Sequence, residues 1–63
     1  MSNLDEKEKI IVGLAAKIVQ EAQKVVPDKK RVYDCAKGIE LLALLGIEFL
    51  AANKKIYLDL LAN

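Results

Sequence analysis

The sequence predicts an all-α fold, in which an antiparallel helical hairpin dimerises into a four-helix bundle. Three observations support this prediction. Apolar residues recur at alternating steps of three and four, which is the spacing of a helix face and not of a strand. The only proline, Pro27, divides the chain into two such stretches. The chain has only 63 residues, and a domain of this size buries only about 60% of the surface that its unfolded chain exposes.

The first helix is predicted over residues 4–26. Asn3 can accept a hydrogen bond from the backbone of the first turn, and Glu6 three residues later completes a capping box. Val12 and Val19 widen the apolar stripe, so we expect this helix to pack against more than one neighbour. The residues predicted to form the stripe itself are Ile11, Ala15, Ile18, Ala22 and Val25.

Residues 27–28 are predicted to form the turn. The ring of Pro27 cannot continue a helix, and Asp28 can cap the helix that follows. So short a turn places the two helices side by side and antiparallel. The second helix is predicted over residues 29–61. Its stripe consists of Val32, Cys35, Ile39, Leu42, Gly46, Phe49, Ile56 and Leu60.

The continuity of the second helix is left open by the sequence. Gly38 and Gly46 each cost about 1 kcal/mol relative to alanine in a helix interior. A glycine also lets a neighbouring helix approach closely, and we expect alanines of the first helix as the counterparts. The helix can break near Gly46 or near Asn53, and a break at Asn53 would give a short third helix over 54–61.

The unequal lengths of the two predicted helices indicate a second copy of the chain. At about 1.5 Å per residue, the second helix extends roughly 13 Å beyond the first. Its apolar side chains would have no neighbours there within a single hairpin. Two antiparallel hairpins packed face to face would cover them, so the two stripes given above are predicted to form the dimer core.

Composition excludes several other classes of protein. The chain is 54% apolar and 30% charged, and its net charge of +1 creates no strong attraction for nucleic acid or an anionic membrane. The uncharged run over 41–47 is far shorter than the roughly 20 residues of a membrane span. We therefore expect a soluble, cytoplasmic protein without a membrane span, and the acidic N-terminus is unlike a signal peptide.

Catalytic and metal-binding side chains are scarce. The chain has no histidine, no threonine and one serine, so no catalytic residue, metal site or cofactor is predicted, and the protein is not expected to be an enzyme. Its one cysteine, Cys35, lies on the apolar stripe and is predicted to be a small buried side chain. An antiparallel dimer would separate the two copies of Cys35, which argues against a disulfide between them.

A chain of this length that turns near its middle resembles the Rop family of dimeric four-helix bundles. With Asn3 and Glu6, the pair Pro27 and Asp28, and the apolar run 41–45, it is more similar to the small four-helix-bundle protein of archaeal spindle-shaped viruses (fuselloviruses). The resemblance implies a dimeric bundle and the interior of a host cell. The RNA-binding face of Rop is not carried over, because the corresponding face here has no aromatic residue. That face consists of Lys9, Gly13, Lys17, Gln20 and Lys24.

A second apolar stripe on the second helix is the best candidate for a functional surface. It lies on the side away from the predicted dimer core, and exposed contiguous apolar surface usually marks a partner site. Alternatively, a wider dimer interface or a higher oligomer covers it. Its residues are Leu41, Leu44, Ile47, Ala51, Leu58 and Leu61.

Basic residues cluster around the turn. Three interpretations are open: these residues form a solvated loop, they bind phosphate, or they pair with the acidic N-terminus of a second copy. The residues of this basic tip are Lys24, Lys29, Lys30 and Arg31.

The function predicted from these features is that of a non-enzymatic protein–protein interaction module, an adaptor or regulator acting as a homodimer. The alternative is a small Rop-like regulator that associates with RNA or DNA. Nucleic acid is the less favoured partner, because no aromatic stacking residue accompanies the basic tip. The sequence does not identify the protein partner.

Overall fold

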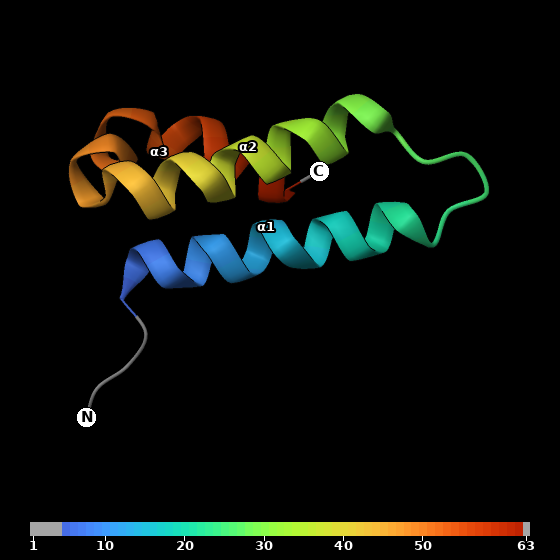
Figure 1. Cartoon of the computed structure of the whole chain (residues 1–63), viewed down its shortest axis with the longest axis horizontal. Coiled ribbons are helices and arrows are strands. Elements are labelled where there is room, and N and C mark those ends of the chain that lie inside the picture. The colour runs from blue at the N-terminus through green and yellow to red at the C-terminus, as the bar shows by residue number, and fades with distance from the viewer. Residues whose placement is uncertain (1–4, 63) are drawn as a thin grey trace.

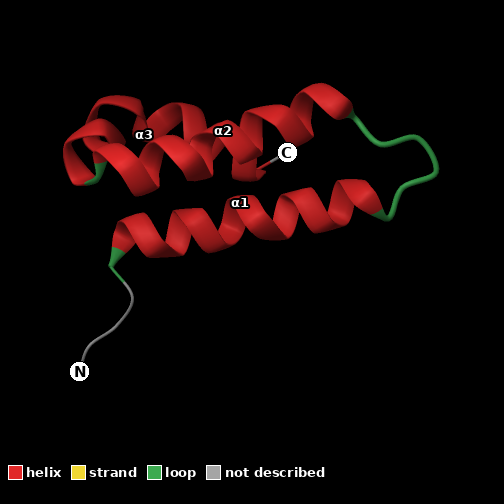
Figure 2. Ribbon diagram, in the orientation of Figure 1, coloured by secondary structure: helices red, strands yellow, loops and turns green. Residues whose placement is uncertain are grey.

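A computed structural model describes residues 5–62, and this part of the chain forms three α-helices and no strand (Figures 1 and 2). α1 spans Glu6–Ala22, α2 spans Lys29–Leu45 and α3 spans Ile47–Ala62. α1 and α2 run antiparallel, as predicted, and α3 folds back so that each helix contacts the other two (Figure 1). The all-α prediction is confirmed. The predicted cap Asn3 and the predicted first helical residue lie outside the described residues.

Aspartates cap both α1 and α2. The side chain of Asp5 accepts a 2.8 Å hydrogen bond from the backbone N–H of Glu8, and that of Asp28 accepts a 3.1 Å bond from the N–H of Arg31. Each bond satisfies a donor that has no partner inside its helix. The predicted cap at Asp28 is therefore confirmed.

The first helix ends at Ala22 and not at residue 26, so the connection to α2 spans 23–28 instead of 27–28. Pro27 explains the earlier end, because a proline ring clashes with the carbonyl four residues before it, here that of Gln23. Val25 was predicted to lie on the helical stripe. It lies in the loop instead, and its exposed fraction is 99%.

The range 29–61, predicted as one helix, is broken at Gly46, which is one of the two positions that the sequence left open. Gly46 has φ 79° and ψ −154°, a backbone conformation that is essentially restricted to glycine. Its N–H still donates to the carbonyl of Leu42 (3.0 Å), and its carbonyl accepts from Leu50 (3.2 Å). The chain therefore changes direction at a single residue.

Asn53, the other position considered for a break, lies inside α3. Its side-chain amide donates a 3.0 Å hydrogen bond to the carbonyl of Phe49, one turn earlier, and leaves the helix intact. An unbroken helix over 29–61 would be roughly 50 Å long, whereas the longest dimension of the chain is 38 Å.

Each helix contributes two side chains to the buried core. Glycines on α1 and α2 let α3 come close to this core: a Cβ atom at Gly38 would lie 2.8 Å from Cε1 of Tyr57, and one at Gly13 would lie 2.9 Å from Cδ2 of Leu61. The close approach expected at Gly38 is therefore present, and its neighbours are Tyr57 of α3 and Leu14 of α1, the latter 3.0 Å from the same Cβ position. The buried core residues are Ile10, Leu14, Cys35, Leu42, Leu50 and Tyr57.

Candidate interaction surfaces

The two stripes predicted to form the dimer core are divided in the structure. Cys35 and Leu42 are buried within the single chain, and burial raises the pKa of the Cys35 thiol. Phe49 and Leu60 pack against this core from α3, whereas Ile56 is exposed. Ile11, Ile18 and Ile39 also pack against this core, from α1 and α2. The remaining helical members of the stripes on these two helices are the half-buried Val32 and the exposed Ala15 and Ala22.

Helical spacing places the stripe residues of α1 and α2 other than Cys35 and Leu42 on one surface, which we term the hairpin face. Gly13 and Gly38 mark the side that contacts α3. A residue two positions along a helix lies about 200° around it, so Ala15 and Ala36 are on the opposite side. The isoleucines and valine of the face are half-buried, and its alanines are exposed. The face consists of Ile11, Ala15, Ile18 and Ala22 from α1 and Val32, Ala36, Ile39 and Ala43 from α2.

The predicted partner surface is largely exposed. Leu44 of α2 and Ile47 and Leu58 of α3 have exposed fractions of 74%, 65% and 46%, and Ala51 of α3 is also exposed. We term these four residues the α3-side patch. The other two predicted members differ: Leu41 is half-buried, and Leu61 is half-buried where it packs against the core beside Gly13. Leu61 is therefore part of the contact that holds α3 in place.

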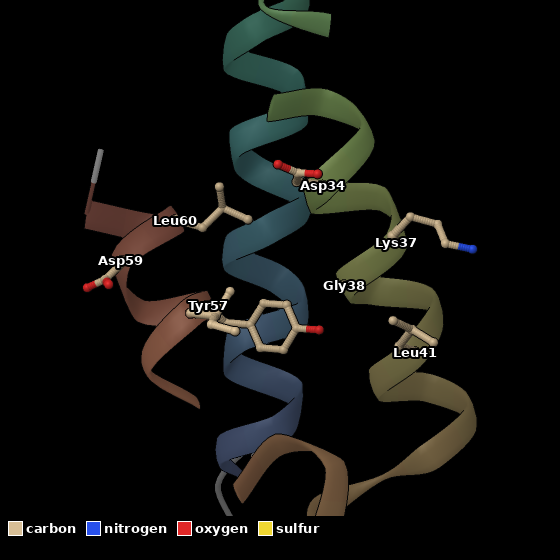
Figure 3. A pocket seen from close by; sticks show the side chains of 8 residues that line it. Asp34, Lys37, Gly38, Leu41, Tyr57, Asp59 and Leu60 are labelled. Atoms are coloured by element: carbon tan, nitrogen blue, oxygen red, sulfur yellow. The ribbon is translucent and has the colours of Figure 1, made fainter. Parts of the chain in front are cut away.

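A shallow groove of about 440 Å³ lies between α2 and α3 (Figure 3). Tyr57 extends from α3 toward α2 beside Gly38 and Leu41, and burial raises the pKa of its phenol. The remaining lining residues are Asp34, Lys37, Ile56, Asp59 and Leu60.

The charged residues at the rim of this groove are paired with neighbours on their own helices. Asp34 bonds to Lys30 at 2.8 Å, Lys37 to Glu40 at 3.0 Å, and Asp59 to Lys55 at 3.2 Å. Apolar side chains make up much of the rest of the lining, among them Leu41, Ile56 and Leu60.

A buried carboxylate, Glu21, organises the basic tip. Its oxygens accept hydrogen bonds from Nζ of Lys24 at 2.7 Å and from the backbone N–H of Asp28 at 2.9 Å, and Nε of Arg31 lies 3.8 Å away. The bond from Lys24 is the main cause of the lowered pKa of Glu21, followed by the bond from Asp28. The sequence did not indicate this role, because it depends on the path of the loop, which brings the N–H of Asp28 to the carboxylate of Glu21.

The cations of the basic tip are therefore partly neutralised within the chain. Lys24 and Arg31 face Glu21, and Lys30 bonds to Asp34, which raises the pKa of Lys30. Lys29 is exposed, and no ion pair joins it to another described side chain. This pairing weakens the tip as a site for phosphate, because fewer charges remain to release counterions from a nucleic acid.

Neither a metal-ligand cluster nor a membrane-spanning helix occurs among the described residues. No group of three or more His, Cys, Asp or Glu side chains within 5–62 is arranged to hold a metal ion. None of the helices in that range combines the length and the apolar character that crossing a bilayer requires.

Comparisons of the chain with protein-family models, with curated proteins and with solved structures find no match. The resemblance to the Rop family and to the fusellovirus bundle protein therefore stays a prediction from the sequence.

Proposed function

We propose that this protein is a non-enzymatic protein–protein interaction module that acts as a homodimer inside the cell, or inside the host cell if it is viral. The observation that supports this proposal is the exposure of Leu44, Ile47 and Leu58, three large apolar side chains outside the three-helix core. Soluble proteins seldom leave contiguous apolar surface uncovered unless a partner covers it.

The α3-side patch is the surface that we assign to a protein partner. Leu44 and Ile47 flank the reversal at Gly46, where the backbone is fixed by hydrogen bonds on both sides. Leu58 lies further along α3, whose position is fixed by the contacts of Tyr57 and Leu61 with the two glycines. The patch is therefore held on rigid elements, so its residues need little ordering when a partner binds.

The test compares three versions of the protein in affinity capture from extracts of the source cells, with identification of the captured proteins by mass spectrometry. The first is the wild type, the second is L44K/L58K, and the third is Q20K/Q23K. The third version adds the same charge at polar positions on α1 and in the loop, outside the patch. Substitutions at exposed positions seldom change stability by more than about 1 kcal/mol, so both variants should stay folded.

We expect L44K/L58K to lose captured proteins that the wild type and Q20K/Q23K retain, because a lysine in an apolar contact must be desolvated on binding. Equal capture by all three versions would contradict the assignment of the patch. Unfolding of L44K/L58K alone would show that these leucines are structural. Salt-dependent binding of RNA or DNA by the wild type would instead support the alternative function, that of a nucleic-acid-associated regulator.

A further inference from the structure

We propose that the groove between α2 and α3 binds a small, uncharged aliphatic molecule that carries a carbonyl oxygen, such as a medium-chain amide, and that the hydroxyl of Tyr57 donates a hydrogen bond to this oxygen. The site goes beyond the proposed function, because its ligand is a small molecule and not a protein. None of the residues that line the groove belongs to the α3-side patch, so the two surfaces can be tested separately.

The hydroxyl of Tyr57 is the feature that points to a ligand. Tyr57 has an exposed fraction of 6%, and its side chain extends from α3 into the groove with the hydroxyl toward α2 (Figure 3). No hydrogen bond joins this hydroxyl to another residue within 5–62. In the same range, no fully buried side-chain oxygen lacks a partner, so the hydroxyl oxygen reaches the open side of the groove. A buried ring thus presents one unpaired polar group to whatever occupies the groove.

The hydroxyl acts toward the ligand as a hydrogen-bond donor. Burial raises the pKa of Tyr57, so the phenol keeps its proton at neutral pH and can donate it. A carbonyl oxygen is an uncharged acceptor with no proton of its own, which makes it the complementary group. The apolar walls of the groove keep much of the competing water away from this bond.

The walls and the size of the groove determine the rest of the ligand. Branched aliphatic side chains line the groove from both helices, Leu41 from α2 and Ile56 and Leu60 from α3. An aliphatic chain placed against them removes apolar surface from water on both sides. The volume of about 440 Å³ lies within the range of about 300–1,000 Å³ that is usual for small-molecule sites.

The charges around the groove argue against an ionised ligand. Acidic and basic side chains occur together on its rim, and each pairs with a neighbour of the opposite sign. A charged group in the groove would be partly desolvated without a free partner. The adjoining hollow past Leu60, about 190 Å³ in volume, also combines both signs, so it offers no separate site for a charged head group. The charged residues of this hollow are Asp28, Lys30, Arg31 and Asp34.

The first experiment compares three probes of equal chain length: octanamide, octanoate and octylammonium. Each is titrated into the ¹⁵N-labelled wild type below the concentration at which the probe self-associates, and backbone amide shifts are recorded. We expect octanamide to shift the amides of Gly38, Leu41 and Ile56 with a dissociation constant of about 1 mM, which is reasonable for a ligand of about ten non-hydrogen atoms. The two ionised probes should bind roughly tenfold more weakly. Equal binding of all three, or shifts spread over the whole chain, would overturn the site.

The second experiment tests individual contacts with octanamide. Y57F removes only the hydroxyl and should weaken binding by about three- to tenfold, the usual worth of a neutral hydrogen bond. I56Q should also weaken it, because it replaces an aliphatic wall residue by a polar one. I47Q is the matched control, since Ile47 and Ile56 are both exposed isoleucines of α3, at 65% and 61%, but Ile47 does not line the groove.

Circular dichroism shows whether each variant keeps its helix content. If Y57F binds octanamide as tightly as the wild type, the assigned hydrogen bond is wrong. If Y57F does not fold, the comparison of I56Q with I47Q decides, and equal binding by these two would overturn the site.

The capture experiment separates this inference from the proposed function. Selective octanamide binding by a wild type that captures no protein would support the groove as a ligand site and leave the interaction module without a partner. No octanamide binding by a wild type whose protein capture requires Leu44 and Leu58 would refute the present inference and retain the module. If Y57F loses captured proteins and the wild type does not bind octanamide, the groove belongs to a protein contact and the inference fails.

Discussion

The substitution Gly38→Ala tests whether α3 docks on α2 as the structure shows. Alanine is favoured over glycine inside a helix by about 1 kcal/mol. The new Cβ, however, would lie 2.8 Å from Cε1 of Tyr57 and 3.0 Å from Cδ1 of Leu14. Tyr57 has an exposed fraction of only 6% and Leu14 is fully buried, so neither can move aside easily. Overpacking of this kind typically costs 1–3 kcal/mol, and we expect a net loss of about 1 kcal/mol.

Gly13→Ala is the matched control for this substitution. The contact is similarly short, 2.9 Å to Cδ2 of Leu61, but that atom is the end of a flexible, half-buried side chain near the end of α3. Leu61 can change rotamer, so the gain in helix propensity of about 1 kcal/mol should prevail and stability should stay equal or rise. Urea unfolding followed by circular dichroism at one fixed concentration measures both. If the two substitutions stabilise the protein equally, Tyr57 does not occupy the site beside Gly38.

Two further predictions concern the reversal and the loop. Gly46→Ala should lower the free energy of unfolding by about 1–3 kcal/mol, because alanine is strained at the positive φ of this residue. A steric clash would not contribute, since no atom lies within 4 Å of the position that the new Cβ would occupy. Unchanged stability in urea would mean that α2 and α3 are not joined by this reversal. Glu21 has a lowered pKa in the folded chain, so its carboxylate stabilises the fold above pH 4.5, the ordinary value, and this contribution disappears as the pH falls through the folded pKa. Glu21→Gln should therefore melt at a lower temperature than the wild type at neutral pH, and the difference should shrink in acid. A difference that stays constant with pH would show that the charge of Glu21 does not contribute.

The parts of the fold that the sequence predicted depend on local patterns. Apolar spacing of three and four is a property of each helix alone, and Pro27 with Asp28 ends one helix and starts the next through its own chemistry. The antiparallel arrangement of α1 and α2 follows from the shortness of their connection. These features need no knowledge of what the helices later contact.

The break at Gly46 could not be predicted in this way. The stripe from Leu42 through Gly46 to Phe49 keeps its spacing across the break, so periodicity gives no indication of it. The cost of a glycine in a helix, about 1 kcal/mol, is too small to decide between a straight and a broken helix. The contacts of Tyr57 with Gly38 and of Leu61 with Gly13 decide it, and they join residues far apart in the sequence.

The candidate surfaces were predicted with mixed success for the same reason. Leu44, Ile47 and Leu58 were expected to be exposed and are. Leu61 was grouped with them by spacing alone, but the reversal at Gly46 turns it toward α1. The role of Glu21 depends on the path of the loop, which brings the N–H of Asp28 to its carboxylate, and spacing within α1 contains no information about that path.

One measurement tests the account as a whole: isotope-filtered NOE spectroscopy on a mixed sample of labelled and unlabelled chains. It distinguishes contacts within a chain from contacts between two copies. The structure predicts that the methyl groups of Leu61 contact the Hα atoms of Gly13 within one chain. If the contact of Leu61 with Gly13 appears only between chains, α3 is not folded back onto its own hairpin, and the structural basis of both proposals fails.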